Sequence, residues 1–85
     1  MPDPLLSIPN VGPKVAARLH ELGIHRLEDL RGADPDDLFA RTEVLSRERE
    51  DPCLLDTYTA IVDVADGKPA RPWWAYSRER KARTA

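Results

Sequence analysis

The stretch that decides the fold is Ile8-Pro9-Asn10-Val11-Gly12-Pro13-Lys14-Val15-Ala16-Ala17-Arg18-Leu19. It is a short turn, rich in proline and glycine, that opens directly into an amphipathic helix. Asn10 and Gly12 tolerate strained or left-handed backbone, and Pro13 suits the first helical position, where no amide is needed. The first amides of a helix have no partner inside it and carry partial positive charge. Beside Lys14, such a turn is typical of a small anion site suited to a phosphate.

The turn resembles the helix-hairpin-helix motif, whose core reads apolar-Pro-Gly-apolar-Gly-Pro-Lys before small or apolar residues. The matching positions are Ile8, Pro9, Val11, Gly12, Pro13, Lys14 and the pair Ala16-Ala17. Asn10 stands where the family commonly has glycine, and asparagine adopts positive φ more readily than other non-glycine residues. The resemblance implies sequence-independent DNA binding through hairpin amides and a basic side chain on backbone phosphates. The alternative is a hairpin that only packs a small helical bundle.

Length and composition limit the chain to one small domain. Its 85 residues, 41% hydrophobic and 33% charged, leave no room for a separate substrate domain or a deep active-site cleft. We expect a helical domain over 1–67 and an aromatic, basic segment over 68–85 that packs on it. We expect no membrane-spanning segment and no signal segment, because no apolar run is long enough and no charged-then-apolar stretch opens the sequence. The single cysteine excludes an internal disulfide and fits the reducing cytoplasm.

Charge is unevenly distributed along the chain, although the formal net charge is only −2. Residues 1–27 carry three basic and two acidic side chains, residues 28–67 four and twelve, and residues 68–85 six and one. A uniform nucleic-acid binder would be basic overall. We therefore expect only weak binding to DNA, through one end or face, with the acidic middle turned away.

Four helix starts place an N-cap residue before a first-turn proline: Asp3-Pro4, Gly12-Pro13, Asp34-Pro35 and Asp51-Pro52. With leucine spacing, they predict helices over 4–8, 13–22, 26–31, 35–46 and 52–66. Gly23 and Gly67 stand where helices end, and Ser77 is expected to cap a last helix over 78–83. No segment alternates at period two. The predicted fold class is all-α, a compact bundle of about five short helices.

A faint internal repeat has an offset of 22 residues, which aligns Ile8–Pro13 with Leu30–Pro35. It predicts two tandem helix-hairpin-helix-like units around a pseudo-two-fold axis. The second unit enters its helix through Asp34, Asp36 and Asp37, which satisfy amides from within and repel phosphate. Only the first hairpin is expected to be competent.

Helical periodicity separates core from surface. Core faces are predicted for Val15, Ala16, Leu19 and Leu22, and for Leu54, Leu55, Tyr58, Ile61, Val62 and Ala65. Lys14 and Arg18 lie one turn apart and project together beside the hairpin; the alternative is an ordinary solvated helix face. The residues predicted to bind DNA are Asn10, Val11, Gly12, Pro13, Lys14 and Arg18.

No enzyme motif is recognisable. His20 and His25 lack further ligands at metal-binding spacing, so a surface or capping role is expected. Cys53 has no basic partner and is expected to be a small buried hydrophobe. Helix capping explains the acidic cluster after Asp34. We expect a binding protein with no catalytic residue, no metal and no cofactor.

The second unusual segment is Arg71-Pro72-Trp73-Trp74-Ala75-Tyr76, which precedes a basic run. Aromatic side chains beside basic ones can stack on unpaired bases, whereas a tryptophan in the tail of a small domain more often seals the core. We expect at least one of the pair to seal the core, and the other to be available to a partner. Candidate contacts for a protein, a second copy or nucleic acid are Trp73, Trp74, Arg78 and Lys81.

The whole pattern resembles a group of small bacterial proteins named pathogenicity-locus or mitomycin-resistance proteins. The resemblance covers nearly the whole chain and rests on the hairpin with Gly23-Ile24, Leu27-Glu28-Asp29-Leu30, Asp34-Pro35, Leu38, Asp51-Pro52-Cys53 and Trp73-Trp74. It implies a stand-alone helix-hairpin-helix protein that binds DNA, and the mitomycin name points to DNA damage. The alternative is a protein-interaction adaptor that uses both tryptophans and the acidic face. Either way we expect a monomer or weak dimer with no membrane partner.

Overall fold

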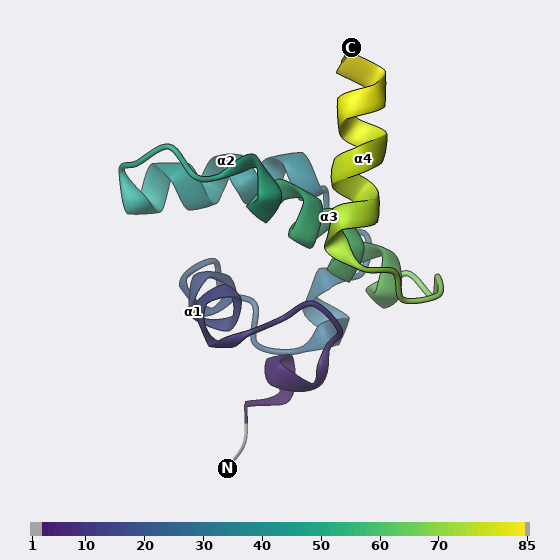
Figure 1. Ribbon diagram of the computed structural model, residues 1–85. Helices are drawn as coiled ribbons and strands as arrows, with labels where there is room; N and C mark the ends of the chain where they lie inside the picture. Colours follow the sequence, from purple (N-terminus) through teal and green to yellow (C-terminus); the bar gives the residue numbers. More distant parts are fainter. Residues whose placement is uncertain (1–2, 85) are drawn as a thin grey trace.

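The computed structural model describes residues 3–84, which form four α-helices and two short 3-10 helices (Figure 1). In chain order these are η1 (Pro4–Ser7), α1 (Pro13–Glu21), η2 (Leu27–Leu30), α2 (Pro35–Ser46), α3 (Pro52–Ala65) and α4 (Trp73–Thr84). No strand occurs within residues 3–84, which confirms the all-α class. The helices predicted over 4–8 and 26–31 are the short 3-10 helices η1 and η2.

The four proline-marked starts are confirmed. At three of them an aspartate accepts a hydrogen bond from the amide two residues later, at 2.9–3.0 Å. These aspartates are Asp3, Asp34 and Asp51. Gly12 takes the same place before α1 but has no side chain, and no side-chain hydrogen bond caps α1 within the described residues. The start of α1 is therefore open where the other three are closed.

The turns before α1 and α2 share two backbone features, a left-handed residue and a turn hydrogen bond. Asn10 has a φ of 73°, and Gly32, 22 residues later, has a φ of 71°. In each turn the following residue donates its amide to the carbonyl three positions earlier, at 3.1 Å. The aligned stretches of the faint sequence repeat thus have similar turns.

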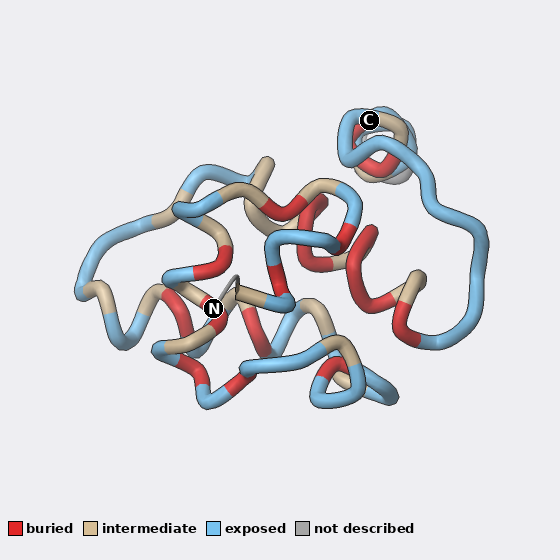
Figure 2. Tube along the Cα trace, turned by 90° about the horizontal axis from the view of Figure 1, so that it is seen from below, coloured by how far each residue is buried: buried red, intermediate tan, exposed pale blue. Residues whose placement is uncertain are grey.

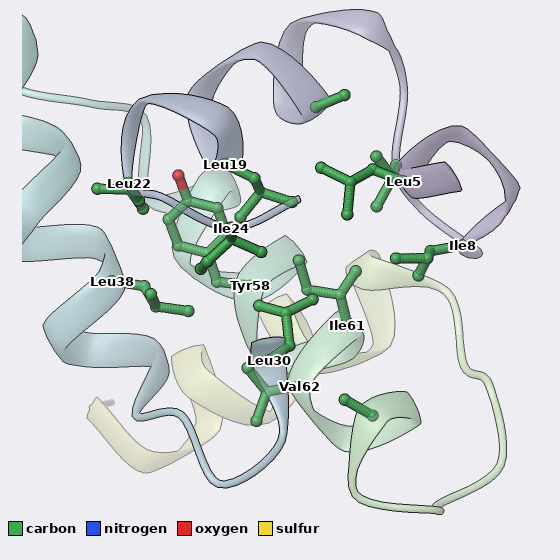
Figure 3. Packing of buried hydrophobic residues seen from close by; sticks show 13 residues of the cluster. Leu5, Ile8, Leu19, Leu22, Ile24, Leu30, Leu38, Tyr58, Ile61 and Val62 are labelled. Carbon is green, nitrogen blue, oxygen red and sulfur yellow. The ribbon is translucent and has the colours of Figure 1, made fainter. Parts of the chain in front are cut away.

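The core surrounds α3 (Figure 3). It collects apolar side chains from every element before α4, among them Leu5, Ile8, Leu19, Leu22, Ile24, Leu30, Leu38, Tyr58, Ile61 and Val62. The Thr42 hydroxyl donates to the Leu38 carbonyl at 2.9 Å, so the Tyr58 hydroxyl, 2.7 Å away, donates to Thr42. The buried phenol is satisfied in this way, and its burial raises the pKa of Tyr58. The predicted core positions on α1 and α3 are buried or half-buried.

Helix α4 stands to one side of the other helices and packs on α3, after an exposed loop (Figures 1 and 2). It begins at Trp73, so the predicted start at 78 is wrong. The Trp73 amide donates to Asn10 Oδ1 at 3.2 Å, a cap from a residue 63 positions away that no local pattern shows. Ser77 lies inside the helix, and its hydroxyl donates to Asp56 on α3.

Candidate functional site

The predicted DNA-binding residues lie at the first turn and the start of α1. Pro13 and Lys14 are exposed, and Gly12 is half-exposed. Val11 differs from the prediction, because its side chain belongs to the core and its amide donates to the Ile8 carbonyl at 3.1 Å. The turn uses this amide to close itself, so it is not available to a phosphate.

The second turn shows which amides of this geometry take an anion. Two of its amides are satisfied by carboxylate oxygens, namely Gly32 by Asp66 at 2.9 Å and Asp36 by Asp34 at 3.0 Å. The equivalent amides in the first turn belong to Asn10 and Lys14. Within residues 3–84 no side chain accepts a hydrogen bond from either. These two amides of the first turn are therefore open, whereas the equivalent amides of the second turn hold carboxylates.

The two predicted cations have different surroundings. The Lys14 side chain is exposed, and its charge helps to lower the pKa of Asp51, after the larger effect of the Cys53 amide. Arg18 is only 25% exposed and forms ion pairs with Glu50 at 3.3 Å and Glu21 at 3.5 Å. The pair does not project together as a basic patch, and Lys14 is the cation that faces solvent beside the turn.

Asn10 joins the first turn to the C-terminal segment. Its left-handed backbone, expected from the sequence, is confirmed by a φ of 73°. The side-chain Nδ2 donates to the Arg71 carbonyl at 2.8 Å, while Oδ1 accepts from the Trp73 amide at 3.2 Å. Because both polar atoms are engaged, the side chain positions backbone and leaves ligand contact to the amide. The asparagine in place of the usual glycine is visible in the sequence, whereas its distant hydrogen-bond partners are not.

Both tryptophans lie at the surface, with Trp73 36% exposed and Trp74 51% exposed. The expectation that one of them seals the core is wrong. Tyr76 is the buried aromatic of this segment, and its hydroxyl donates to Asp63 Oδ2 at 2.6 Å. The Arg78 guanidinium carbon lies 5.3 Å from the centroid of the Trp74 ring. Lys81 is exposed one turn further along this face of α4.

A buried carboxylate fixes α4 on α3. Asp56 is buried and accepts hydrogen bonds from the Ser77 hydroxyl and from Arg80, whose Nε and Nη2 lie 3.0 and 3.2 Å from its two oxygens. Such a bidentate pair holds one orientation. The start of α4, and with it the tryptophan pair, is thus held at two points, by Asn10 and by Asp56.

The remaining polar residues serve the fold. His20 Nε2 lies 2.6 Å from Asp3 Oδ2, and its Nδ1 lies 2.6 Å from Nδ1 of His25. Cys53 is half-buried, less than expected, and its hydrogen bond with Asp51 and its burial raise the pKa of the thiol. Among residues 3–84 no three His, Cys, Asp or Glu side chains are arranged to hold a metal ion. In the same part of the chain, no helix is long and apolar enough to cross a membrane.

The fold and this surface define a small all-helical protein with one open turn, an adjacent lysine and two exposed tryptophans. The profile of the Cdd1 family, described as "Pathogenicity locus", matches residues 2–82, and the chain belongs to this family. The mitomycin resistance protein McrB of Streptomyces lavendulae is 47% identical over 77 residues, which cover 91% of this chain and 73% of that relative. No solved structure matches the chain. The resemblance to pathogenicity-locus and mitomycin-resistance proteins that we inferred from the sequence is confirmed.

Proposed function

We propose that this protein binds the DNA backbone without sequence preference through its first turn. The comparison between its two turns carries the proposal. The amides of Gly32 and Asp36 hold carboxylate oxygens, whereas the equivalent amides of Asn10 and Lys14 are open within the described residues. A phosphate oxygen is the external counterpart of those carboxylates. The exposed Lys14 adds a positive charge at the position where the second turn has the acidic Asp36.

We interpret residues 4–21 and 27–46 as tandem helix-hairpin-helix units. Their matching φ values and turn hydrogen bonds support this interpretation. The second unit is degenerate as a phosphate site, because its own carboxylates occupy it. One hairpin and one lysine provide two or three phosphate contacts, which correspond to a dissociation constant near the weak end of ~10⁻⁴–10⁻⁶ M.

The role that we propose is resistance to DNA damage. The name of the Streptomyces lavendulae relative refers to mitomycin resistance. A chain that binds DNA without reading its sequence suits lesions at any position. The proposal is of a binding protein without catalytic residues or cofactor, acting in the cytoplasm.

The sharpest test replaces Gly12 with aspartate. A Cβ at Gly12 meets no atom within 4 Å, and its φ of −102° is ordinary, so the side chain fits without strain. In Gly12→Asp the new carboxylate should cap α1 as Asp34 caps α2. Folding stability should stay equal or rise by a few tenths of a kcal/mol. DNA binding should fall by more than about tenfold, because the carboxylate occupies the Lys14 amide and repels phosphate.

Gly12→Ala is the matched control, since it adds a Cβ without an oxygen and should keep binding. An amide-resolved NMR titration with a short duplex, at low and then physiological salt, measures both variants. Salt-sensitive shifts of the parent protein should centre on residues 10–18. Unchanged affinity in Gly12→Asp would contradict the site.

A second prediction concerns Lys14. Lys14→Glu should weaken duplex binding about tenfold without unfolding the protein, because the side chain is exposed and its loss removes one phosphate contact. Arg47→Glu, at the exposed end of α2, is the matched charge reversal and should bind nearly as the parent does. Fluorescence anisotropy of labelled duplex and thermal unfolding supply the two readouts. Equal losses in both variants would mean that only net charge matters.

A protein-interaction adaptor is the second candidate. The exposure of both tryptophans, and of Val44 and Leu45 on α2, favours it. Sedimentation that depends on protein concentration, together with no response to DNA, would select this function over DNA binding.

A further inference from the structure

We propose that the tryptophan pair beside the first turn stacks on an unpaired base, so that the protein prefers DNA whose duplex adjoins a single-stranded end or gap. The inference rests on the proposed function, because the first turn supplies the grip on the backbone. It adds a substrate class that backbone binding alone does not give.

The first step is the fixed connection between the two surfaces. Asn10 is the residue whose amide we assign to phosphate, and its side chain holds the Arg71 carbonyl at 2.8 Å and the Trp73 amide at 3.2 Å. The tryptophans therefore begin one hydrogen bond away from the turn.

The second step is that the fold does not need these rings in its core. Tyr76 is the buried aromatic of the segment, and Asp56 with Arg80 fixes α4 on α3. Both tryptophan rings stay exposed at the surface, where they are available to a binding partner. With the Arg78 guanidinium in place, Trp74 is still 51% exposed.

The third step is the charge around the rings, which favours nucleic acid over an ordinary protein partner. The described side chains over 68–82 comprise five basic groups and one acidic group. That acidic group, Glu79, is neutralised by Arg71 at 2.6 Å. On α3, Asp56 is paired with Arg80, and Asp63 accepts from Tyr76 and pairs with Lys68 at 3.5 Å. Exposed aromatics among cations are the combination that single-strand binders use to stack bases and follow phosphates.

The fourth step explains why the base must be unpaired. Inside a continuous duplex each base is stacked between its neighbours and offers only its edges to a protein. A ring can stack on a base face only where the stack is interrupted, at an end, a gap or a single-stranded extension. The two surfaces therefore suit a junction between duplex and single strand. The turn binds the duplex backbone, and the tryptophans stack on an unpaired base.

The test compares three DNAs: a short blunt duplex, the same duplex with a single-stranded extension, and the extension strand alone. Affinity is measured by anisotropy of labelled DNA. Trp73 and Trp74 are the only tryptophans of the chain, so intrinsic tryptophan fluorescence reports directly on these two rings. The extended duplex should bind about 5- to 100-fold more tightly than the blunt duplex and should quench this fluorescence.

Variants of Trp74 separate stacking from general apolar contact. Trp74→Leu should lose the preference for the extended duplex but keep the affinity for the blunt one, whereas Trp74→Phe should keep most of the preference. Leu45→Ala, an exposed apolar residue on α2, is the control and should change neither affinity. Thermal unfolding checks that each variant is folded.

The outcomes distinguish the two proposals. If the blunt duplex binds in a Gly12- and Lys14-dependent way and the extension adds neither affinity nor quenching, the junction preference is overturned and backbone binding stands. A preference that persists in Trp74→Leu also overturns it. If no DNA binds, both proposals fail.

Discussion

Lys14 and Arg18 lie one turn apart on α1, yet their surroundings assign them different roles. Lys14 faces solvent beside the open amides. Arg18 lies against Glu50, whose side chain is only 13% exposed and whose Oε1 is buried without a hydrogen bond among the described residues. The ion pair with Arg18, at 3.3 Å, compensates this buried charge. Arg18 therefore stabilises the fold, and we expect its part in DNA binding to be small.

Replacing Arg18 with glutamine should lower the free energy of unfolding by about 1–3 kcal/mol, because Glu50 is left buried without its counter-charge. Glu50→Gln should restore much of this loss in the double variant, and chemical denaturation of the full cycle measures the coupling. Duplex affinity should change less than in Lys14→Glu. An Arg18→Gln variant with parent stability and strongly weakened binding would return Arg18 to the phosphate site.

The local backbone of the candidate site could be predicted from the sequence where it depends on neighbours along the chain. The turn, its left-handed Asn10 and the open start at Gly12 follow from local residue types. The partner of Arg18 does not, because Glu50 is 32 positions away and approaches only through the path of the chain between α2 and α3. Val11 shows a second limit of prediction from sequence. Its apolar side chain is visible in the sequence, but the hydrogen bond from its amide to the Ile8 carbonyl, which closes the turn, is not.

At the scale of elements, helix starts differ in the same way, because some are capped by a neighbouring residue and one is capped by a distant residue. Asp3, Asp34 and Asp51 cap helices that directly follow them, and these starts were predicted correctly. Helix α4 takes its cap from Asn10, so sequence analysis assigned the start to Ser77, the nearest local capping residue. The Ser77 hydroxyl instead donates a hydrogen bond to Asp56. A cap supplied across the fold leaves no local sequence signal.

The cap from Asn10 makes an ordered prediction for two variants. Asn10→Gly keeps a residue suited to a φ of 73° but loses both side-chain hydrogen bonds, which should cost about 1 kcal/mol of stability. Asn10→Ala loses the same bonds and adds left-handed strain of about 1–2 kcal/mol. Thermal unfolding should rank parent above Asn10→Gly above Asn10→Ala, and amides in the first turn of α4 should exchange faster in both. Unchanged exchange in Asn10→Gly would show that the connection does not hold α4.

The docking of α4 should also respond to alkaline pH through Tyr76. Burial and the hydrogen bond to Asp63 raise the pKa of Tyr76 to about 12, above the ordinary value of about 10. Because the folded state favours the neutral phenol, this stabilisation is complete below pH ~10 and is lost as the pH rises toward ~12. Stability measured across this window should fall in the parent and fall less in Tyr76→Phe. Tyrosinate absorbance should show the matching late titration, and a Tyr76 that ionises near pH ~10 would contradict it.

At the scale of the whole molecule, the first and second turns share a left-handed residue and a turn hydrogen bond but differ in charge. The second turn is closed by Asp34 and Asp66, in the acidic middle of the chain. The first turn is open, and the basic C-terminal segment is attached to it through Asn10. A protein with a net charge of −2 can therefore present one locally basic surface to DNA. The arrangement predicts weak, one-sided binding with few ionic contacts.

The salt dependence of binding measures the number of ionic contacts to DNA phosphates. Two or three phosphate contacts give a slope of about −2 to −3 in a plot of log affinity for blunt duplex against log salt, and Lys14→Glu should make it shallower by about 1. An unpaired base adds stacking, which releases no counterions, so the junction DNA should bind more tightly with nearly the same slope. Dissociation constants at several salt concentrations give all three values. A slope near zero would exclude phosphate contacts. A slope steeper than about −5 would need more cations than one turn offers, and would transfer the main binding role to the basic face of α4.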